Sequence, residues 1–229
     1  MKRILAISFV FLFFAAGAHA QSGVGQGPRF YGDFKPVVGG WSEYQMTARG
    51  EPPTKMKVAV VGKEGPNYWY ETVMQGEMRM VSKMLVSGNP GDRSNLKRMI
   101  MKAGSEKAME MDVAAMMARQ PAGGPKGASP KAVDKGMETV RVPAGTFQAR
   151  HLQYREGSDV VDAWVSGTVT PYGIVKSKSR DMEMVLTGKG TGATTLITET
   201  PRKFSMPPMP QGMPKGMPHG AMPGMGGGN

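Results

Sequence analysis

Apolar and polar residues alternate along most of the chain after residue 40, and clusters of Gly, Pro, Asn and Asp interrupt the alternation. Between residues 55 and 62, for example, Met56, Val58 and Val60 alternate with Lys55 and Lys57. A period of two is typical of a half-buried antiparallel strand. By ordinary strand spacing the pattern predicts about ten strands, at residues 41–49, 55–62, 68–74, 77–87, 138–142, 146–155, 160–166, 174–179, 182–188 and 193–200.

The middle of the chain, residues 88–136, has a different pattern and is predicted to be a helical and flexible insertion. Residues 95–102 fit a helix or a strand equally well because the apolar run is short. Residues 108–119 are predicted to be helical, since Met109, Val113, Met116 and Met117 would lie near one face. The Pro- and Gly-rich stretch 121–130 holds too few large apolar residues to pack.

A sheet of this many antiparallel strands is expected to curl. The predicted fold class is therefore mainly β, an antiparallel, strongly curved sheet resembling a half-open barrel, which occupies residues 40–204. An N-terminal arm, residues 21–39, precedes this domain. A Met-, Pro- and Gly-rich tail, residues 205–229, follows it and is predicted to be disordered.

The first twenty residues have the pattern of a secretion signal. Lys2 and Arg3 precede an apolar run that is too short to span a bilayer, and Ala18 and Ala20 supply small residues for cleavage after Ala20. The sequence thus predicts a periplasmic or secreted protein. No Cys follows the signal, so a soluble product without a lipid anchor is expected.

Composition narrows the possible functions. The chain contains no Cys, which excludes thiol enzymes, c-type haem proteins and Cys-ligated zinc sites. The formal net charge is +11, but Lys and Arg are spread along the chain without an arginine-rich block, so no nucleic-acid binding is expected. The basic surface would also suit a structural component of the cell envelope.

The most distinctive motif runs from Val142-Pro143-Ala144-Gly145-Thr146-Phe147 through Trp164-Val165-Ser166 to Pro171-Tyr172-Gly173-Ile174-Val175-Lys176. It resembles a group of uncharacterised exported bacterial proteins. The order of elements is more distantly similar to the periplasmic lipoprotein carriers of LolA-like fold, which implies a half-open barrel with an apolar cavity. The resemblance transfers no functional residue.

No catalytic motif is present. The mature chain would keep His151 and His219, and neither a Gly-x-Ser-x-Gly elbow nor a His-Glu-x-x-His helix occurs. Asp162 and Trp164 share one face of their strand, which suits either a cavity mouth or ordinary packing. We therefore expect a non-enzymatic protein without a resident cofactor.

The leading hypothesis is a protein that binds an apolar small molecule, an acyl chain or a lipid, with a possible peripheral membrane or lipoprotein contact. The candidate ligand-binding residues are Trp41, Tyr44, Trp69, Trp164, Met78 and Met80. The alternative is Cu(I) or Ag(I) binding by the tail, because thioethers are soft ligands. Its candidate metal ligands are Met206, Met209, Met213, Met217, His219, Met222 and Met225.

Overall fold

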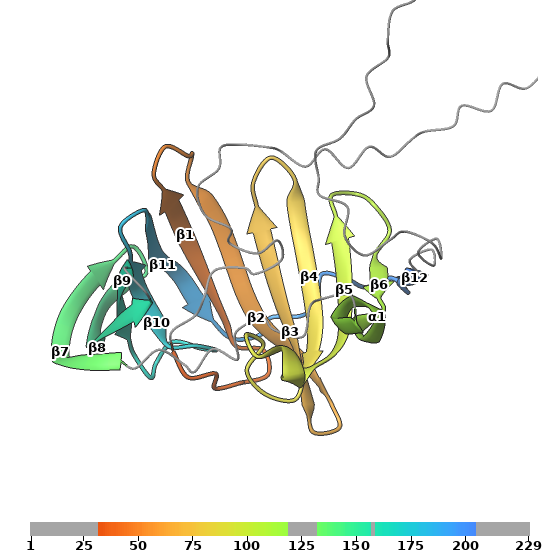
Figure 1. The fold of residues 1–229 in the computed structure, drawn as a ribbon, viewed down its shortest axis with the longest axis horizontal. Helices are drawn as coiled ribbons and strands as arrows, with labels where there is room; N and C mark the ends of the chain where they lie inside the picture. The colour runs from red at the N-terminus through yellow and green to blue at the C-terminus, as the bar shows by residue number, and fades with distance from the viewer. Residues whose placement is uncertain (1–31, 119–131, 157–158, 205–229) are drawn as a thin grey trace, which may run out of the picture. The chain divides into compact units, whose positions relative to one another are not determined.

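The computed structural model describes residues 32–118, 132–156 and 159–204, and their strands form a single 12-stranded sheet (Figure 1). The strands are β1 (Trp41–Ala48), β2 (Thr54–Glu64), β3 (Asn67–Gln75), β4 (Arg79–Val86), β5 (Leu96–Ala103), β6 (Met109–Met111), β7 (Ala132–Val142), β8 (Gly145–Glu156), β9 (Asp159–Val165), β10 (Ile174–Lys178), β11 (Met182–Gly190) and β12 (Arg202–Phe204). Helices in these residues are the short η1 (Arg93–Asn95) and α1 (Val113–Ala118). The prediction of a mainly β, curved sheet is confirmed.

The strand order is β12-β6-β5-β4-β3-β2-β1-β11-β10-β9-β8-β7. Strands β1 to β6 form one meander and β7 to β11 form another, and β1 joins the two by pairing antiparallel with β11. Only the β12–β6 pair among these neighbours is parallel. In Figure 1 the strands β7 to β10 turn away from the plane of β1 to β6, which gives the sheet its curvature.

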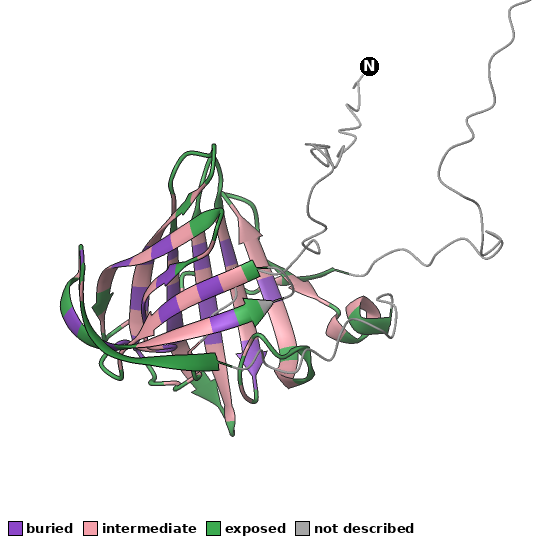
Figure 2. Cartoon of the chain, turned by 60° about the vertical axis from the view of Figure 1, so that its left-hand side comes forward, coloured by how far each residue is buried: buried purple, intermediate pink, exposed green. Residues whose placement is uncertain are grey.

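The core follows the alternation of the sequence. Tyr44, Met56 and Val58 are fully buried on one face of β1 and β2. Figure 2 shows buried positions, in purple, between half-buried ones, in pink, along strands of the sheet. Cross-strand register places Tyr44 opposite Met56, so their side chains pack on the same face. The alternating hydrophobic residues therefore do pack as a strand pattern predicts.

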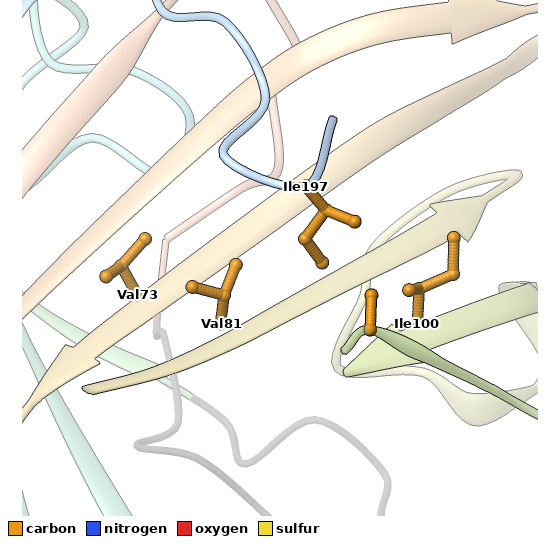
Figure 3. Packing of buried hydrophobic residues seen from close by; sticks show 5 residues of the cluster. Val73, Val81, Ile100 and Ile197 are labelled. Carbon is orange, nitrogen blue, oxygen red and sulfur yellow. The ribbon is translucent and has the colours of Figure 1, made fainter. Parts of the chain in front are cut away.

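The other face of β3, β4 and β5 is covered by the segment between β11 and β12. Ile197, which is 4% exposed, packs there with Val73, Val81, Ile100 and Ala108 (Figure 3). The prediction of a strand over residues 193–200 is wrong, because this segment crosses the sheet without joining a ladder. Its Leu196 amide donates to the carboxylate of Glu71.

The middle of the chain also differs from the prediction. Residues 96–103 are a strand, which resolves their ambiguity, because β5 pairs with β4 along its length. The helix predicted over residues 108–119 is wrong for Met109–Met111, which form β6 beside β5, and right for α1, which packs against β5. The stretch 121–130 lies outside the described residues, as do residues 1–20, predicted to be a secretion signal, and residues 205–229, predicted to be a disordered tail.

None of the helices in the described part of the chain is long and apolar enough to cross a membrane.

Candidate functional site

Seven methionines lie on one face of β3, β4, β5 and β6. Register places Met74 opposite Met80, and Met84 opposite Met99. Directly opposite residues in an antiparallel pair project to the same side of the sheet. On β5 and β6, Met99 lies opposite Met111 and Met101 lies opposite Met109. We call this surface the methionine face, and its members are Met74, Met80, Met84, Met99, Met101, Met109 and Met111.

The methionine face continues the buried core but is itself accessible. Met56, opposite Met74 on the same face, is 0% exposed. By contrast the seven members are half-buried, apart from Met109, which is 41% exposed. The same apolar face of the sheet is thus packed at β1, at β2 and at Tyr70 of β3, and partly open at the methionines of β3 to β6.

The positions between these methionines are also uncharged. Thr72, Ser82 and Ala103 occupy paired positions on this face of β3, β4 and β5. The nearest charged partner in register is Arg202 of β12, which pairs with Met109, while Phe204 pairs with Met111. Methionine has a flexible, polarisable side chain that adapts to the shape of a bound apolar group. The face therefore suits an apolar ligand of variable shape.

Next to Met84, at its register partner Tyr70, this apolar face is covered by aromatic rings. Phe34 and Tyr172 lie over Tyr70, with ring centroids 5.9 Å from that of Tyr70 in both cases. Tyr44 donates its hydroxyl proton to the carbonyl of Ile174 over 3.1 Å. Burial raises the pKa of Tyr44, Tyr70 and Tyr172 well above the ordinary value, so all three are neutral phenols at physiological pH. This part of the sheet is a packed core.

The structure separates the residues predicted to bind a ligand. Met80 belongs to the methionine face, whereas Tyr44 is fully buried on the same side of the sheet. Trp41 and Trp69 alternate with inward-facing neighbours and so lie on the opposite side, where Lys57 and Lys83 contact their rings. Met78 precedes β4 and is exposed. The six residues therefore do not form one site.

Trp164 belongs to a separate cluster centred on His151. The imidazole Nε2 lies 2.8 Å from Asp162 Oδ1, and Nδ1 lies 2.8 Å from Glu138 Oε1. The indole of Trp164 stacks on the imidazole with ring centroids 4.5 Å apart and donates to Glu138 Oε2 over 2.7 Å. Three neighbouring strands, β7, β8 and β9, supply these four side chains.

Burial and hydrogen bonds shift the pKa values of His151 and Glu138 in this cluster. Partial burial lowers the pKa of His151, but hydrogen bonds to Asp162 and Glu138 outweigh it, so the pKa lies above its ordinary value. Hydrogen bonds from Trp164 and His151 lower the pKa of Glu138. Both imidazole nitrogens are occupied, so His151 in this arrangement has no free nitrogen to act as a base or a metal ligand. The cluster ties strands together.

A surface depression of about 460 Å³ lies beside this cluster and is lined by Asp159, Asp162, Trp164, Lys178 and Arg180, among others. Its charged lining does not suit an apolar ligand. Within residues 32–118, 132–156 and 159–204, no group of three or more His, Cys, Asp or Glu side chains could hold a metal ion. The metal ligands predicted in the tail, Met206 to Met225 with His219, lie outside the described residues.

The methionine face and the His151 cluster both depend on strand register. The sequence alone does not show that seven methionines align across four strands. It also shows His151 without a partner, because Glu138 and Asp162 approach it from the two neighbouring strands. The alternation of Asp162 and Trp164 on one face was the available signal, and the structure confirms that placement.

Comparisons with known proteins identify similar structures only. No family model and no curated protein sequence matches the chain. A candidate exported protein of YmcC-like fold from Bacteroides fragilis is 12% identical, with a TM-score of 0.35 over 70% of this chain and 100% of that one. A candidate lipoprotein from Parabacteroides distasonis is 14% identical, with a TM-score of 0.35 over 72% and 100% of the two chains. MucB in its complex with MucA(peri) is 10% identical, with a TM-score of 0.42 over 68% of this chain and 51% of MucB.

Proposed function

We propose that this chain is an exported, non-enzymatic binding protein that holds an apolar ligand, such as an acyl chain, a lipid or a lipid-modified partner, on the methionine face. The observation that carries the proposal is the alignment of seven partly exposed methionines across β3 to β6. The secretion-signal pattern of residues 1–20 supports a periplasmic or secreted location.

Energetics favour an apolar occupant over a polar one. Each buried CH₂ group of a ligand contributes about 0.8 kcal/mol when it leaves water. The paired positions of the methionine face offer few hydrogen-bonding groups, mainly the hydroxyls of Thr72 and Ser82. A polar ligand would therefore lose hydrogen bonds to water that this surface does not replace.

The direct test is binding of a fluorescent fatty acid to the full chain, together with native mass spectrometry of protein purified from its own envelope. We expect a retained apolar adduct or saturable uptake of the fatty acid. A clean apo mass together with no uptake of the probe would overturn the proposal.

A charged substitution locates the binding surface. Met84→Lys places an ammonium group in the row of the methionine face that contains Met99 and Met111, and we expect it to weaken fatty-acid binding at least about tenfold, which corresponds to about 1.4 kcal/mol. The matched control is Met137→Lys, because Met137 lies on edge strand β7 and is 64% exposed. Equal affinity of the two variants would exclude the methionine face as the binding surface.

A further inference from the structure

Four members of the methionine face form a compact group at the β6 end of the sheet. Met99 lies opposite Met111, and Met101 lies opposite Met109. Opposite residues in an antiparallel pair are about 5 Å apart, and positions i and i+2 of one strand are about 7 Å apart. The four side chains therefore start from the corners of a small rectangle on one face. All four of these positions are methionine.

We infer that Met99, Met101, Met109 and Met111 form a binding site for a soft monovalent metal ion, Cu(I) or Ag(I). Thioether sulfur is a soft donor that selects Cu(I) over hard cations. The chain has no Cys, so methionine supplies all of its sulfur ligands. This function goes beyond apolar-ligand binding and depends on sulfur rather than on hydrophobicity.

The geometry permits several sulfurs to reach one ion. Each methionine side chain is unbranched and has three rotatable bonds, so sulfurs that start at the corners of the rectangle can turn inward to a common centre. Three of the four side chains are half-buried and Met109 is exposed, which leaves a path for the ion to enter. No side chain in the group has to leave its strand position.

The charged side chains around these four methionines are compatible with a bound monovalent cation. Glu110 alternates with Met109 and Met111, so it lies on the opposite side of the sheet, where it pairs with Arg98 over 2.7 Å. Arg202 pairs in register with Met109 and is exposed to solvent, which screens its repulsion of the ion. Phe204, in register with Met111, adds an apolar border.

Thioethers do not titrate, which distinguishes this site from one that uses histidine. Binding to His or Cys requires loss of a proton and therefore weakens in acid. Binding to four methionines should keep the same affinity between about pH 7 and about pH 4. A site that depends on His219 would lose affinity over this range, since the ordinary pKa of His is about 6.5.

The experiment compares full-length variants by anaerobic titration of Cu(I) against a competing chelator. The background replaces the tail methionines by leucine (Met206→Leu, Met209→Leu, Met213→Leu, Met217→Leu, Met222→Leu and Met225→Leu). In this background we expect one Cu(I) bound with sulfur scattering in X-ray absorption. Adding Met99→Leu, Met101→Leu, Met109→Leu and Met111→Leu should weaken binding at least about 100-fold. The matched control adds Met46→Leu, Met74→Leu, Met137→Leu and Met182→Leu and should bind like the background.

Two outcomes would overturn the inference: no Cu(I) bound by the tail-substituted background, or equal affinity of the two four-leucine variants. Leucine is close to methionine in volume and hydrophobicity, so the variant that loses Cu(I) should keep the fold of the background. Fatty-acid binding is measured on the unsubstituted protein and does not depend on this series of variants. The metal site and the apolar-ligand proposal can thus fail separately.

Oxidation footprinting of the unsubstituted protein tests the same site without relying on the fold of a variant. Peroxide converts accessible methionines to sulfoxides, and a bound Ag(I) blocks the sulfur lone pairs. We expect Ag(I) to slow oxidation of Met99, Met101, Met109 and Met111 about tenfold or more and to leave Met137 unchanged. Equal oxidation rates with and without Ag(I) would contradict the inference.

Discussion

The indole nitrogen of Trp164 donates a hydrogen bond to Glu138 over 2.7 Å. This bond joins β9 to the edge strand β7 across the intervening strand β8. His151 of β8 forms a hydrogen bond with the same Glu138 carboxylate. Most side chains of β7 are exposed, so this strand depends on such links as well as on its ladder with β8. The His151 cluster is therefore expected to stabilise the exposed edge of the sheet.

Replacing His151 should make stability less dependent on pH. The folded-state pKa of His151 is raised above its unfolded value of about 6.5. Its stabilisation is therefore fully present below about pH 6.5 and is lost as pH rises through the folded-state pKa. We expect His151→Gln to lower the free energy of unfolding by about 1 kcal/mol at pH 6 and by less at pH 9, after allowance for solvent screening.

Urea unfolding at several pH values measures this dependence. The matched control is Gln148→Ala on the same strand, since Gln148 is exposed and bonds to Thr139. The control should not change the slope of stability against pH. A His151→Gln protein with the same slope as the unsubstituted protein would show that the imidazolium does not stabilise the fold.

Ile197 provides a prediction about the covered face of the sheet. Its side chain packs against Val73, Val81 and Ile100, and Ile197→Ala would leave a cavity there. We expect a loss of about 3 kcal/mol in the free energy of unfolding, or about 9 °C in Tm. Leu196→Ala is the control, because Leu196 is 43% exposed, and should cost under about 1 kcal/mol. Equal losses in the two variants would contradict the observed packing.

The strands of the two meanders could be predicted from the sequence, whereas the segment that covers them could not. Met56, Val58 and Val60 alternate with lysines and form β2 as expected. Residues 193–200 also have a strand-like composition, but the Leu196 amide is taken by the buried carboxylate of Glu71 rather than by a neighbouring strand. A side-chain acceptor from another part of the chain leaves no local trace in the sequence.

The region around β6 shows why short apolar stretches are ambiguous. Met109, Val113 and Met116 have the spacing of a helix, while Met109 and Met111 also have the spacing of a strand. Residues 109–111 form a strand because β5 is available as a hydrogen-bonding partner. The registers of β3 to β6 create the methionine face, and those of β7 to β9 surround His151 with carboxylates. Both groupings therefore depend on long-range pairing that a single sequence does not encode in any local pattern.

Glu71 should control the attachment of the covering segment. Its carboxylate is buried and accepts hydrogen bonds from the Thr195 hydroxyl over 2.7 Å and from the Leu196 amide over 3.1 Å. Glu71→Ala would leave that amide without its acceptor, at a cost of about 1–3 kcal/mol. We expect faster hydrogen exchange at Leu196 by about tenfold or more, with Glu71→Gln intermediate and the Val58 amide in β2 least affected. Unchanged exchange at Leu196 in Glu71→Ala would contradict this role.

Glu199 makes the second attachment, and its pH dependence has the opposite sign to that of His151. The Lys102 ammonium, 2.5 Å from Glu199 Oε1, is the main cause that lowers the pKa of this carboxyl from 4.5 to about 2. Its stabilisation is therefore present above about pH 4.5 and is lost as pH falls toward 2. We expect Glu199→Gln to be less stable than the unsubstituted protein at pH 7 and the difference to shrink as the pH falls to 2, as measured by thermal unfolding across this range. Glu106→Gln, at an exposed carboxylate in the turn after β5, is the control and should follow the unsubstituted protein throughout. A constant difference between Glu199→Gln and the unsubstituted protein from pH 7 to pH 2 would mean that the ion pair with Lys102 does not stabilise the folded chain.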